Sequence, residues 1–210
     1  MTINEIKKNA LAIMFVNYEY DLADIDVDTI TDEEYTKYTV NMNACINRAL
    51  KRIENAGVLP NKSVVINSGT AGEIGTYLSR YNLGTLASDC KTVQRVAKTD
   101  AWGRYAPCVE FSIEEDVIIL PTLAKAESYR VMYQPKVQKI SLSAISSTEI
   151  NIPDEVAEII PYFIKAELYE EDEPSMAANA RNIFEATLDS LRRDEYAQQT
   201  VVHDIYRGLQ

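Results

Sequence analysis

Three glycines in the stretch SGTAGEIGT, residues 68–76, have the residue type and spacing that could hold a phosphate. Gly69, Gly72 and Gly75 would let backbone N–H groups approach an anion closely. Their pattern is GxxGxxG, whereas dinucleotide-binding proteins use GxGxxG and a P-loop needs a following Lys-Ser/Thr pair. The carboxylate of Glu73 would also repel an anion. We interpret the segment as a surface loop, and a small acidic nucleotide-binding protein or enzyme that uses Gly69–Gly75 is the alternative function.

Acidic side chains are the second candidates for chemistry. A glycosidase needs two carboxylates several ångströms apart in a cleft, whereas the acids at 114–116 and 170–173 are adjacent runs typical of solvated turns. Three aspartates at alternate positions share the first spacing of a calcium loop: Asp24, Asp26 and Asp28. Thr29 and Tyr35 stand where that loop needs glycine and glutamate. We predict no catalytic carboxylate and no metal site.

Histidine and cysteine chemistry is not expected either. The one histidine, His203, lies near the C-terminal end, where helices fray and a base is poorly placed. Cys45, Cys90 and Cys108 are odd in number and contain no CxxC pair, which indicates idle thiols in a reducing compartment. The prediction is therefore a protein without catalytic residues, cofactor or metal, and hence not an enzyme.

Composition limits the possible partners. The chain has 210 residues, 46% of them hydrophobic, which is enough for one core with appended arms. No apolar window is long enough to span a membrane, and residues 1–15 lack the pattern of a signal peptide. The net charge of −11 argues against a protein that tracks DNA phosphates.

The N-terminal part is predicted to be helical. Thr2 and Glu5 have the spacing of a capping box before a helix over 3–16. Thr31 and Glu34 repeat that spacing before a longer helix that ends at Gly57. Its apolar stripe is Tyr35, Tyr38, Met42, Cys45/Ile46, Ala49 and Ile53. Residues 17–30 are predicted to be an extended connection.

The middle of the chain changes to short segments rich in Val, Ile and Tyr. They cover 63–68, 91–98, 107–113, 116–121 and 128–134, with a tight reversal at Glu114-Glu115 and a loop with one helical turn over 69–90. We predict an antiparallel β-meander of four or five strands. With helices on both sides of it in the sequence, the fold class is α+β.

Helical periodicity returns at residue 152. We predict helices over 153–160, 161–171 and 174–193, with Pro174 starting the last one after the acidic run. The predicted inner face of that last helix is Met176, Ala180, Ile183/Phe184, Thr187/Leu188 and Leu191. The chain is thus expected to hold a helical domain of 1–60 plus 152–194, a β-rich domain of 61–151, and an arm of 195–210.

Two further groups are candidate contacts. The arm carries a few apolar residues, Tyr196, Val201, Val202, Ile205 and Tyr206, and is predicted either to lie on its own chain as a strand or arm or to be ordered by another subunit. Trp102, Arg104 and Tyr105 are interpreted as an interface anchor or as a packed corner of the sheet.

The stretch 160–193 resembles the C-terminal helices of the head-to-tail connector, or portal-adaptor, proteins of tailed bacteriophages. The shared features are a proline and aromatic entry, an Ala-x-Leu-Tyr step, an acidic turn, and small residues before a Phe and Leu. Here they are Pro161-Tyr162-Phe163, Ala166-Glu167-Leu168-Tyr169, Glu171-Asp172, Ala177-Ala178, Phe184 and Leu188/Leu191. Residues 41–60 resemble the long helix of such adaptors. The strand-rich middle departs from the smallest connectors, although larger adaptors insert a sheet there.

The resemblance implies a structural protein of the virion neck, assembled in the bacterial host cytoplasm. Such adaptors form a homo-oligomeric ring, typically dodecameric, under the portal protein and offer a platform to the tail or stopper protein. DNA would be a non-specific passenger in the channel, which an acidic lining suits, and the arm would insert into the portal or a neighbouring subunit. A bacterial protein-interaction module that binds a partner helix is a further alternative.

Overall fold

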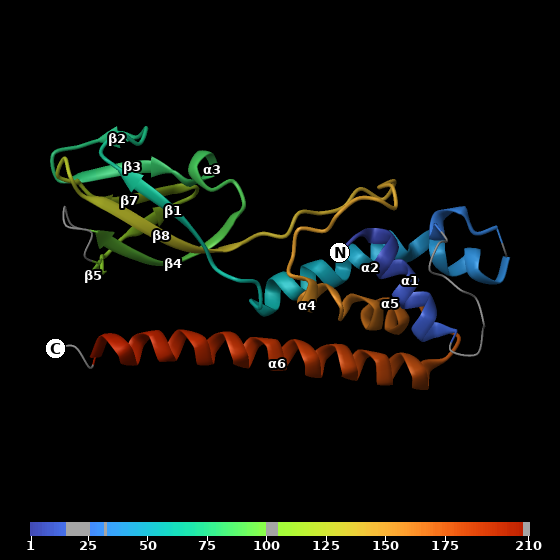
Figure 1. The fold of residues 1–210 in the computed structure, drawn as a ribbon. Coiled ribbons are helices and arrows are strands. Elements are labelled where there is room, and N and C mark those ends of the chain that lie inside the picture. The colour runs from blue at the N-terminus through green and yellow to red at the C-terminus, as the bar shows by residue number, and fades with distance from the viewer. Residues whose placement is uncertain (16–25, 32, 100–104, 208–210) are drawn as a thin grey trace. The chain divides into compact units, whose positions relative to one another are not determined.

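The computed structural model describes residues 1–15, 26–31, 33–99 and 105–207, and for residues 34, 105–108 and 193–207 it describes the backbone alone. The chain forms two compact units (Figure 1). The helical unit comprises Met1–Leu59 with Val137–Gln210, and the β unit comprises Pro60–Lys136. The chain therefore leaves the helical unit once, builds the β unit, and returns.

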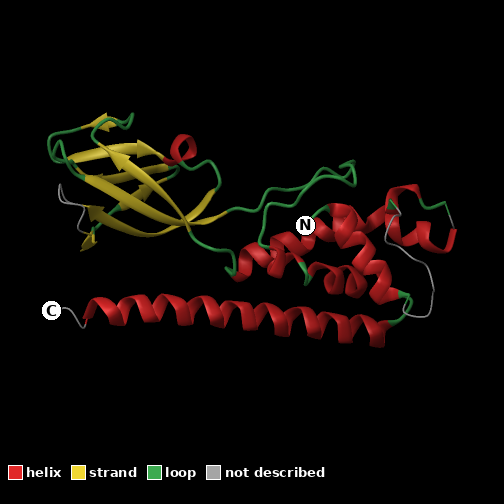
Figure 2. Ribbon diagram, in the orientation of Figure 1, coloured by secondary structure: helices red, strands yellow, loops and turns green. Residues whose placement is uncertain are grey.

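Helices from both ends of the chain build the helical unit (Figure 2). They are α1 (Ile3–Met14), the 3-10 turn η2 (Val27–Thr29), α2 (Glu33–Ala56), α4 (Asp154–Ala157), α5 (Ile160–Leu168) and α6 (Pro174–Arg207). The predicted capping box of α1 is confirmed, because Thr2 N donates to Glu5 Oε2 at 2.6 Å and Glu5 N donates to Thr2 Oγ1 at 3.2 Å. The predicted box at Thr31 and Glu34 lies partly outside the description, since the Glu34 side chain is not described.

The core of the helical unit follows the predicted stripe of α2. All seven members are buried: Tyr35, Tyr38, Met42, Cys45, Ile46, Ala49 and Ile53. They pack with buried residues of α1, α5 and α6 in one cluster. Gly57 ends α2 with a φ of 72°, a left-handed conformation that favours glycine at the position after a helix.

The predicted inner face of α6 is partly wrong. Ala180, Phe184 and Leu188 are buried as predicted, and Ala177 joins them, but Met176 and Ile183 are exposed. The buried residues form a narrow stripe, so the neighbouring helices cover a smaller arc of α6 than the apolar pattern suggested. Small residues at 177 and 180 allow those helices to approach closely.

The β unit contains two four-stranded antiparallel sheets. The strands are β1 (Lys62–Asn67), β2 (Glu73–Ile74), β3 (Leu78–Asn82), β4 (Cys90–Thr99), β5 (Tyr105–Cys108), β6 (Ser112–Glu114), β7 (Val117–Pro121) and β8 (Ser128–Pro135). One sheet has the order β1-β8-β4-β5 and the other the order β2-β3-β7-β6. Buried residues of both sheets, among them Ile66, Tyr81, Ile118, Tyr129 and Val131, share one core. The α+β class with an antiparallel region inserted between helices is confirmed.

The strand count and part of the loop assignment are corrected. The described residues form eight strands (4 + 4) rather than four or five. β2 and β3 lie in the segment predicted as a loop, where α3 (Leu83–Leu86) is the predicted helical turn. The predicted strand 107–113 is split into the end of β5 and most of β6. The reversal between β6 and β7 lies at Glu115-Asp116, and Glu115 adopts a φ of 55°.

The return segment, residues 137–151, belongs to the helical unit and not to the predicted β-rich domain. We call it the strap. Side chains of α2 hold its backbone: Asn43 Nδ2 donates to Leu142 O, and Asn47 both donates to Ile140 O and accepts from Ile140 N, each at 2.9 Å. Glu54 Oε2 accepts from Val137 N at 2.9 Å. Polar side chains of one helix therefore satisfy backbone groups that have no strand partner.

Candidate functional site

The glycines at 69–75 serve the β2–β3 hairpin. Gly75 N donates to Leu78 O at 3.0 Å, and a Cβ added at Gly75 would lie 2.4 Å from that same oxygen. A Cβ at Gly72 would lie 2.7 Å from both Arg80 O and a Tyr81 ring carbon. Two of the three glycines are thus required by close backbone packing. Gly69 N donates to Asn67 Oδ1 at 2.9 Å, so the N–H groups of Gly69 and Gly75 both have acceptors within the chain.

Gly75→Ala is expected to destabilise the β unit by about 1–3 kcal/mol, because the backbone must move to relieve the clash with Leu78 O. Gly69→Ala is the matched control, since its Cβ would lie 3.3 Å from the adaptable Asn67 side chain. Thermal unfolding followed by circular dichroism compares the two variants. Equal melting temperatures would contradict this explanation of Gly75. Nucleotide binding is better tested with the wild-type chain, because the Gly75 variant alters the fold.

The acidic elbow, residues 169–173, joins α5 to α6 and is fastened to α2. Tyr38 OH donates to Asp172 Oδ2 at 3.2 Å, and Lys37 Nζ lies 3.6 Å from the same oxygen. Lys37 also stands over the Tyr38 ring, 4.5 Å from its centroid. Arg181 of α6 lies 3.7 Å from Glu170. Two acids of the elbow, Glu170 and Asp172, therefore contact side chains of α6 and α2.

Aromatic rings pack together next to the elbow. Tyr38 contacts Phe15 and Tyr169 edge to face, with centroid distances of 5.6 and 5.8 Å. The buried Tyr169 hydroxyl donates to Met14 O at 2.9 Å, and burial raises the pKa of that hydroxyl. Lys165 donates to Ile13 O at 2.5 Å. The end of α1, which lacks basic residues in its last turn, thus has its carbonyl groups satisfied by α5 and the elbow.

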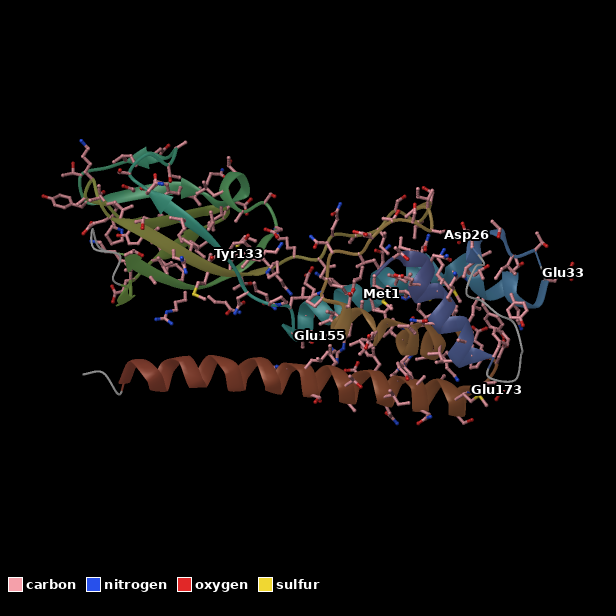
Figure 3. All side chains as sticks on the ribbon, viewed as in Figure 1. Met1, Asp26, Glu33, Tyr133, Glu155 and Glu173 are labelled. Atoms are coloured by element: carbon pink, nitrogen blue, oxygen red, sulfur yellow. The ribbon has the colours of Figure 1, made fainter. Side chains whose placement is uncertain are left out.

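Two of the aspartates with calcium-loop spacing, Asp26 and Asp28, connect η2 to α1 and to the strap. Asp28 pairs with Lys7 of α1, whose side chain is only 2% exposed. Ser146 Oγ of the strap lies 2.5 Å from Asp26 Oδ1 and 2.8 Å from Asp28 Oδ2, and its single proton serves one of them at a time. Figure 3 labels Asp26 in this part of the helical unit. Asp24 lies outside the described residues.

Ser146→Ala is expected to weaken the helical unit at neutral pH. The Ser146 hydrogen bond is the main reason that the pKa of Asp26 lies below its ordinary value of 3.8. A depressed folded-state pKa stabilises the protein above the unfolded value, and this contribution is lost as pH falls through the folded pKa. The difference between wild type and Ser146→Ala should therefore shrink as pH falls below 3.8.

Urea unfolding at neutral pH and in that acid range measures this change, and Ser147→Ala is the control at an exposed neighbour. A difference between wild type and Ser146→Ala that stays constant with pH would rule out the carboxylate as its cause.

Tyr133, Asp89 and Lys62 form a polar group in the β unit. Tyr133 OH donates to Asp89 Oδ1 at 2.9 Å, and Lys62 Nζ lies 2.6 Å from Asp89 Oδ2. Burial and the bond to Asp89 raise the pKa of Tyr133 to about 12, which does not suit a general base at neutral pH. Burial also raises the pKa of the Cys45 and Cys90 thiols, so neither is activated as a nucleophile.

The predicted C-terminal arm is corrected. Instead of ending near residue 193, α6 continues as one helix to Arg207, so the strand conformation is excluded for these residues. The candidate contact residues Tyr196, Val201, Val202, Ile205 and Tyr206 lie on this helix, as does His203, and their side chains are outside the description. The side chains of the second predicted contact group are also outside the description. Trp102 and Arg104 lie outside the described residues, and Tyr105 begins β5.

The structure shows exposed apolar residues that the sequence reasoning did not select. In the β2–β3 hairpin, Ile74, Tyr77 and Leu78 are exposed, Tyr77 by 85%. In the helical unit, Val40 of α2 and Leu142 and Ile145 of the strap are exposed. Val40 is an apolar residue on the polar side of α2, so the sequence alone could have indicated that it is exposed. The strap has no helical or strand period, so nothing in it indicated which side chains face outward.

No helix in the described part of the chain combines the length and apolar character needed to cross a membrane. The described residues also contain no group of three or more His, Cys, Asp or Glu side chains arranged to hold a metal ion. The features that could contact a partner are, in the helical unit, the elbow, α6 and the strap, and, in the β unit, the β2–β3 hairpin. Comparison of the chain with protein-family models and with curated proteins finds no match.

Proposed function

We propose that the chain is a structural head-to-tail adaptor of a phage virion. It forms a ring under the portal, extends the DNA channel, and gives the tail or stopper a docking platform. The proposal rests on the resemblance of residues 160–193 to portal adaptors, whose shared features have clear packing roles in the fold. For example, Phe184 is fully buried and its ring lies 5.0 Å from that of Phe163, while Tyr169 and Asp172 fasten the elbow.

The length and phase of α6 are the structural observation that supports a docking role for the C-terminal turns. Eighteen residues are five turns of an α-helix (5 × 3.6). Val202 therefore lies in line with the buried Phe184 (202 − 184 = 18), and Tyr206 lies in line with the buried Leu188 (206 − 188 = 18). Val202 and Tyr206 thus form a short apolar stripe on the same side of the helix as Phe184 and Leu188, and the polar residues Glu195 and Gln198 lie between the two groups. A helical segment with such a stripe is suited to a groove on a partner protein.

The charge of the chain supports the same function. A net charge of −11 disfavours adhesion to DNA phosphates, which suits a channel through which DNA must slide. The proposed localisation is the virion neck.

The test is docking of the purified chain to portal rings of its phage, imaged by electron microscopy. Wild type is expected to add a ring of portal symmetry. Val202→Ser with Tyr206→Ser is expected to reduce docking at least tenfold, because about 1.5–3 kcal/mol is lost per buried apolar side chain. Thr200→Ser with Asp204→Ser, on the opposite side of the helix, is the matched control. Wild type that never docks overturns the function, and unchanged docking of the Val202/Tyr206 variant overturns the role of α6.

A further inference from the structure

The ends of the two described sheets differ in how well they are protected against pairing with another strand. β2 and β6, at the ends of the second sheet, have two and three residues. β5 has an irregular register with β4 and contains Pro107. β1 has six residues, no proline and one unbroken register with β8, and its one charged side chain, Lys62, is paired with Asp89. Short length, irregular register and proline protect sheet edges, so β1 is the least protected edge of the described sheets.

The free side of β1 presents the backbone groups of Ser63 and Val65. Asn67 N donates to Thr70 Oγ1 at 2.9 Å and Asn67 O accepts from Thr70 N at 3.0 Å, so both groups of Asn67 point away from β8. Backbone groups alternate between the two sides of a strand, so those of Val65 and Ser63 point the same way. Both residues are exposed, and β1 is the last strand of its sheet. Each of them thus offers one N–H donor and one C=O acceptor at the edge.

These backbone groups fit a second copy of β1. In an antiparallel pair with Val64 opposite Val64, Ser63 of each copy lies opposite Val65 of the other, and each such pair of residues exchanges two hydrogen bonds. Every free donor and acceptor of Ser63 and Val65 is then used. Centring the pair on Ser63 or on Val65 instead forms fewer bonds, because Asn61 lies outside β1 and the backbone groups of Asn67 are already bonded.

The charges of the chain permit this register. Lys62 of each copy lies opposite Ile66 of the other, so no like charges stand directly opposite each other. The β unit, Pro60–Lys136, contains nine Lys and Arg and eight Asp and Glu, a net charge of +1 (9 − 8). The helical unit carries the remaining −12 (−11 − 1). Two copies that meet through their β units therefore repel each other far less than two that meet through their helical units.

We propose that β1 of one copy pairs with β1 of a second copy and joins their two sheets into one. β2 and β6 of a second copy are too short to fill the edge equally well, and β5 is too irregular. The contact uses the same strand on both sides, so it links two copies and leaves no free edge at β1. It goes beyond the proposed adaptor function, because a two-fold pair cannot by itself close a larger ring.

The contact is small. Two six-residue strands bury far less than the roughly 1,000 Å² that a stable interface needs, so free copies should associate weakly. Copies held on a common partner would reach effective concentrations in the millimolar range, where a weak contact is occupied. The tests therefore use the full chain alone at high concentration, and their outcome does not depend on whether the chain docks to a portal.

Amide hydrogen exchange of the wild-type chain, followed by NMR, is the first test. The N–H groups of Ser63 and Val65 should exchange more slowly at about 1 mM protein than at about 0.1 mM, because pairing is concentration-dependent. The N–H of Asn67 is the internal control, since it is bonded to Thr70 within its own chain. Equal rates for Ser63 and Val65 at both concentrations would overturn the inference, whether the edge is open or covered by another segment.

Disulfide trapping tests the register. In a background with Cys90→Ser and Cys108→Ser, Val64→Cys places the two introduced thiols in a pair whose Cα atoms are about 4.5 Å apart, within the range of a disulfide. Ser63→Cys is the matched control, because its two copies lie about 8 Å apart in this register and cannot be bridged. Oxidised glutathione supplies the disulfide that is exchanged, and two reduced glutathiones are released for each cross-link.

Val64→Cys is expected to give about fivefold or more cross-linked dimer than Ser63→Cys, because only its thiols meet the geometric range. Equal yields from the two variants would overturn the register.

Val65→Pro, added to Val64→Cys, asks whether the backbone makes the contact. Proline is tolerated on an edge strand where the N–H faces outward, so the substitution removes a donor from the free edge and none from the ladder with β8. It should reduce the disulfide yield to the level of Ser63→Cys, whereas Val65→Thr, which keeps the N–H, should not. A Val65→Pro chain that keeps both its melting temperature and the full yield would overturn the inference. Hydrogen exchange of the wild type tests the same contact if Val65→Pro unfolds the chain.

Discussion

Asp28→Asn is expected to lower the free energy of unfolding of the helical unit by about 2–4 kcal/mol. Removing one partner of a fully buried ion pair costs about 3–5 kcal/mol, and Asp28 is 39% exposed, so the expected value is somewhat smaller. The variant leaves the Lys7 ammonium, only 2% exposed, without its carboxylate. A buried charge without a partner is costly because it has lost its hydration and gained nothing in return.

The companion variants make this prediction specific. Lys7→Met fills similar space without a charge, and it leaves Asp28 partly exposed and still able to accept from Ser146. Its cost should be clearly smaller than that of Asp28→Asn. The double variant should be more stable than Asp28→Asn alone, because no buried charge remains. Urea unfolding of wild type, the two single variants and the double variant measures these free energies. A cost of Lys7→Met equal to that of Asp28→Asn would contradict the expected difference between the two variants.

The features that could be predicted from the sequence depend on neighbouring residues. The capping box of Thr2 and Glu5, the glycine after α2, and the break at Pro174 each act within one helical turn, so their residue types are sufficient. The stripe of α2 could also be predicted, because seven residues at helical spacing leave one direction for burial. These local signals also gave the α+β class.

The β2–β3 hairpin was missed because one of the two buried positions of β3 is polar. Ser79 is fully buried on β3 and shares a hydrogen bond of 3.0 Å with Thr122, while its neighbours Leu78 and Arg80 face outward. At Ser79 a polar residue is buried while the apolar Leu78 is exposed, so the usual strand pattern of buried apolar and exposed polar residues is absent.

The extent of α6 and the place of the strap needed other information. Arg192 and Arg193 suggested the C-terminal end of the helix, where cations suit the dipole, yet the chain has no glycine or proline between Pro174 and Gly208 to stop the helix. The strap is held by Asn43 and Asn47 across 99 and 93 residues of sequence. An asparagine on a helix indicates no partner at that distance.

Phe184→Ala is expected to lower the free energy of unfolding of the helical unit by about 3–5 kcal/mol, because the truncation leaves a cavity in a core that cannot fully collapse. Phe184 is fully buried and meets the Phe163 ring at a centroid distance of 5.0 Å and an angle of 62°. The edge-to-face contact adds to the apolar area that is lost. Phe184 also packs α6 on α5 through Phe163, so its loss weakens the contact between the two helices.

Ile183→Ala is the control, since Ile183 is the adjacent residue and is 38% exposed. Its cost should stay below about 1 kcal/mol, the scale of substitutions outside a core. If Ile183→Ala destabilised the chain as much as Phe184→Ala, the buried stripe of α6 would be wrongly placed. The in-line positions of Val202 and Tyr206, and with them the surface proposed to meet the portal, would then be wrong as well.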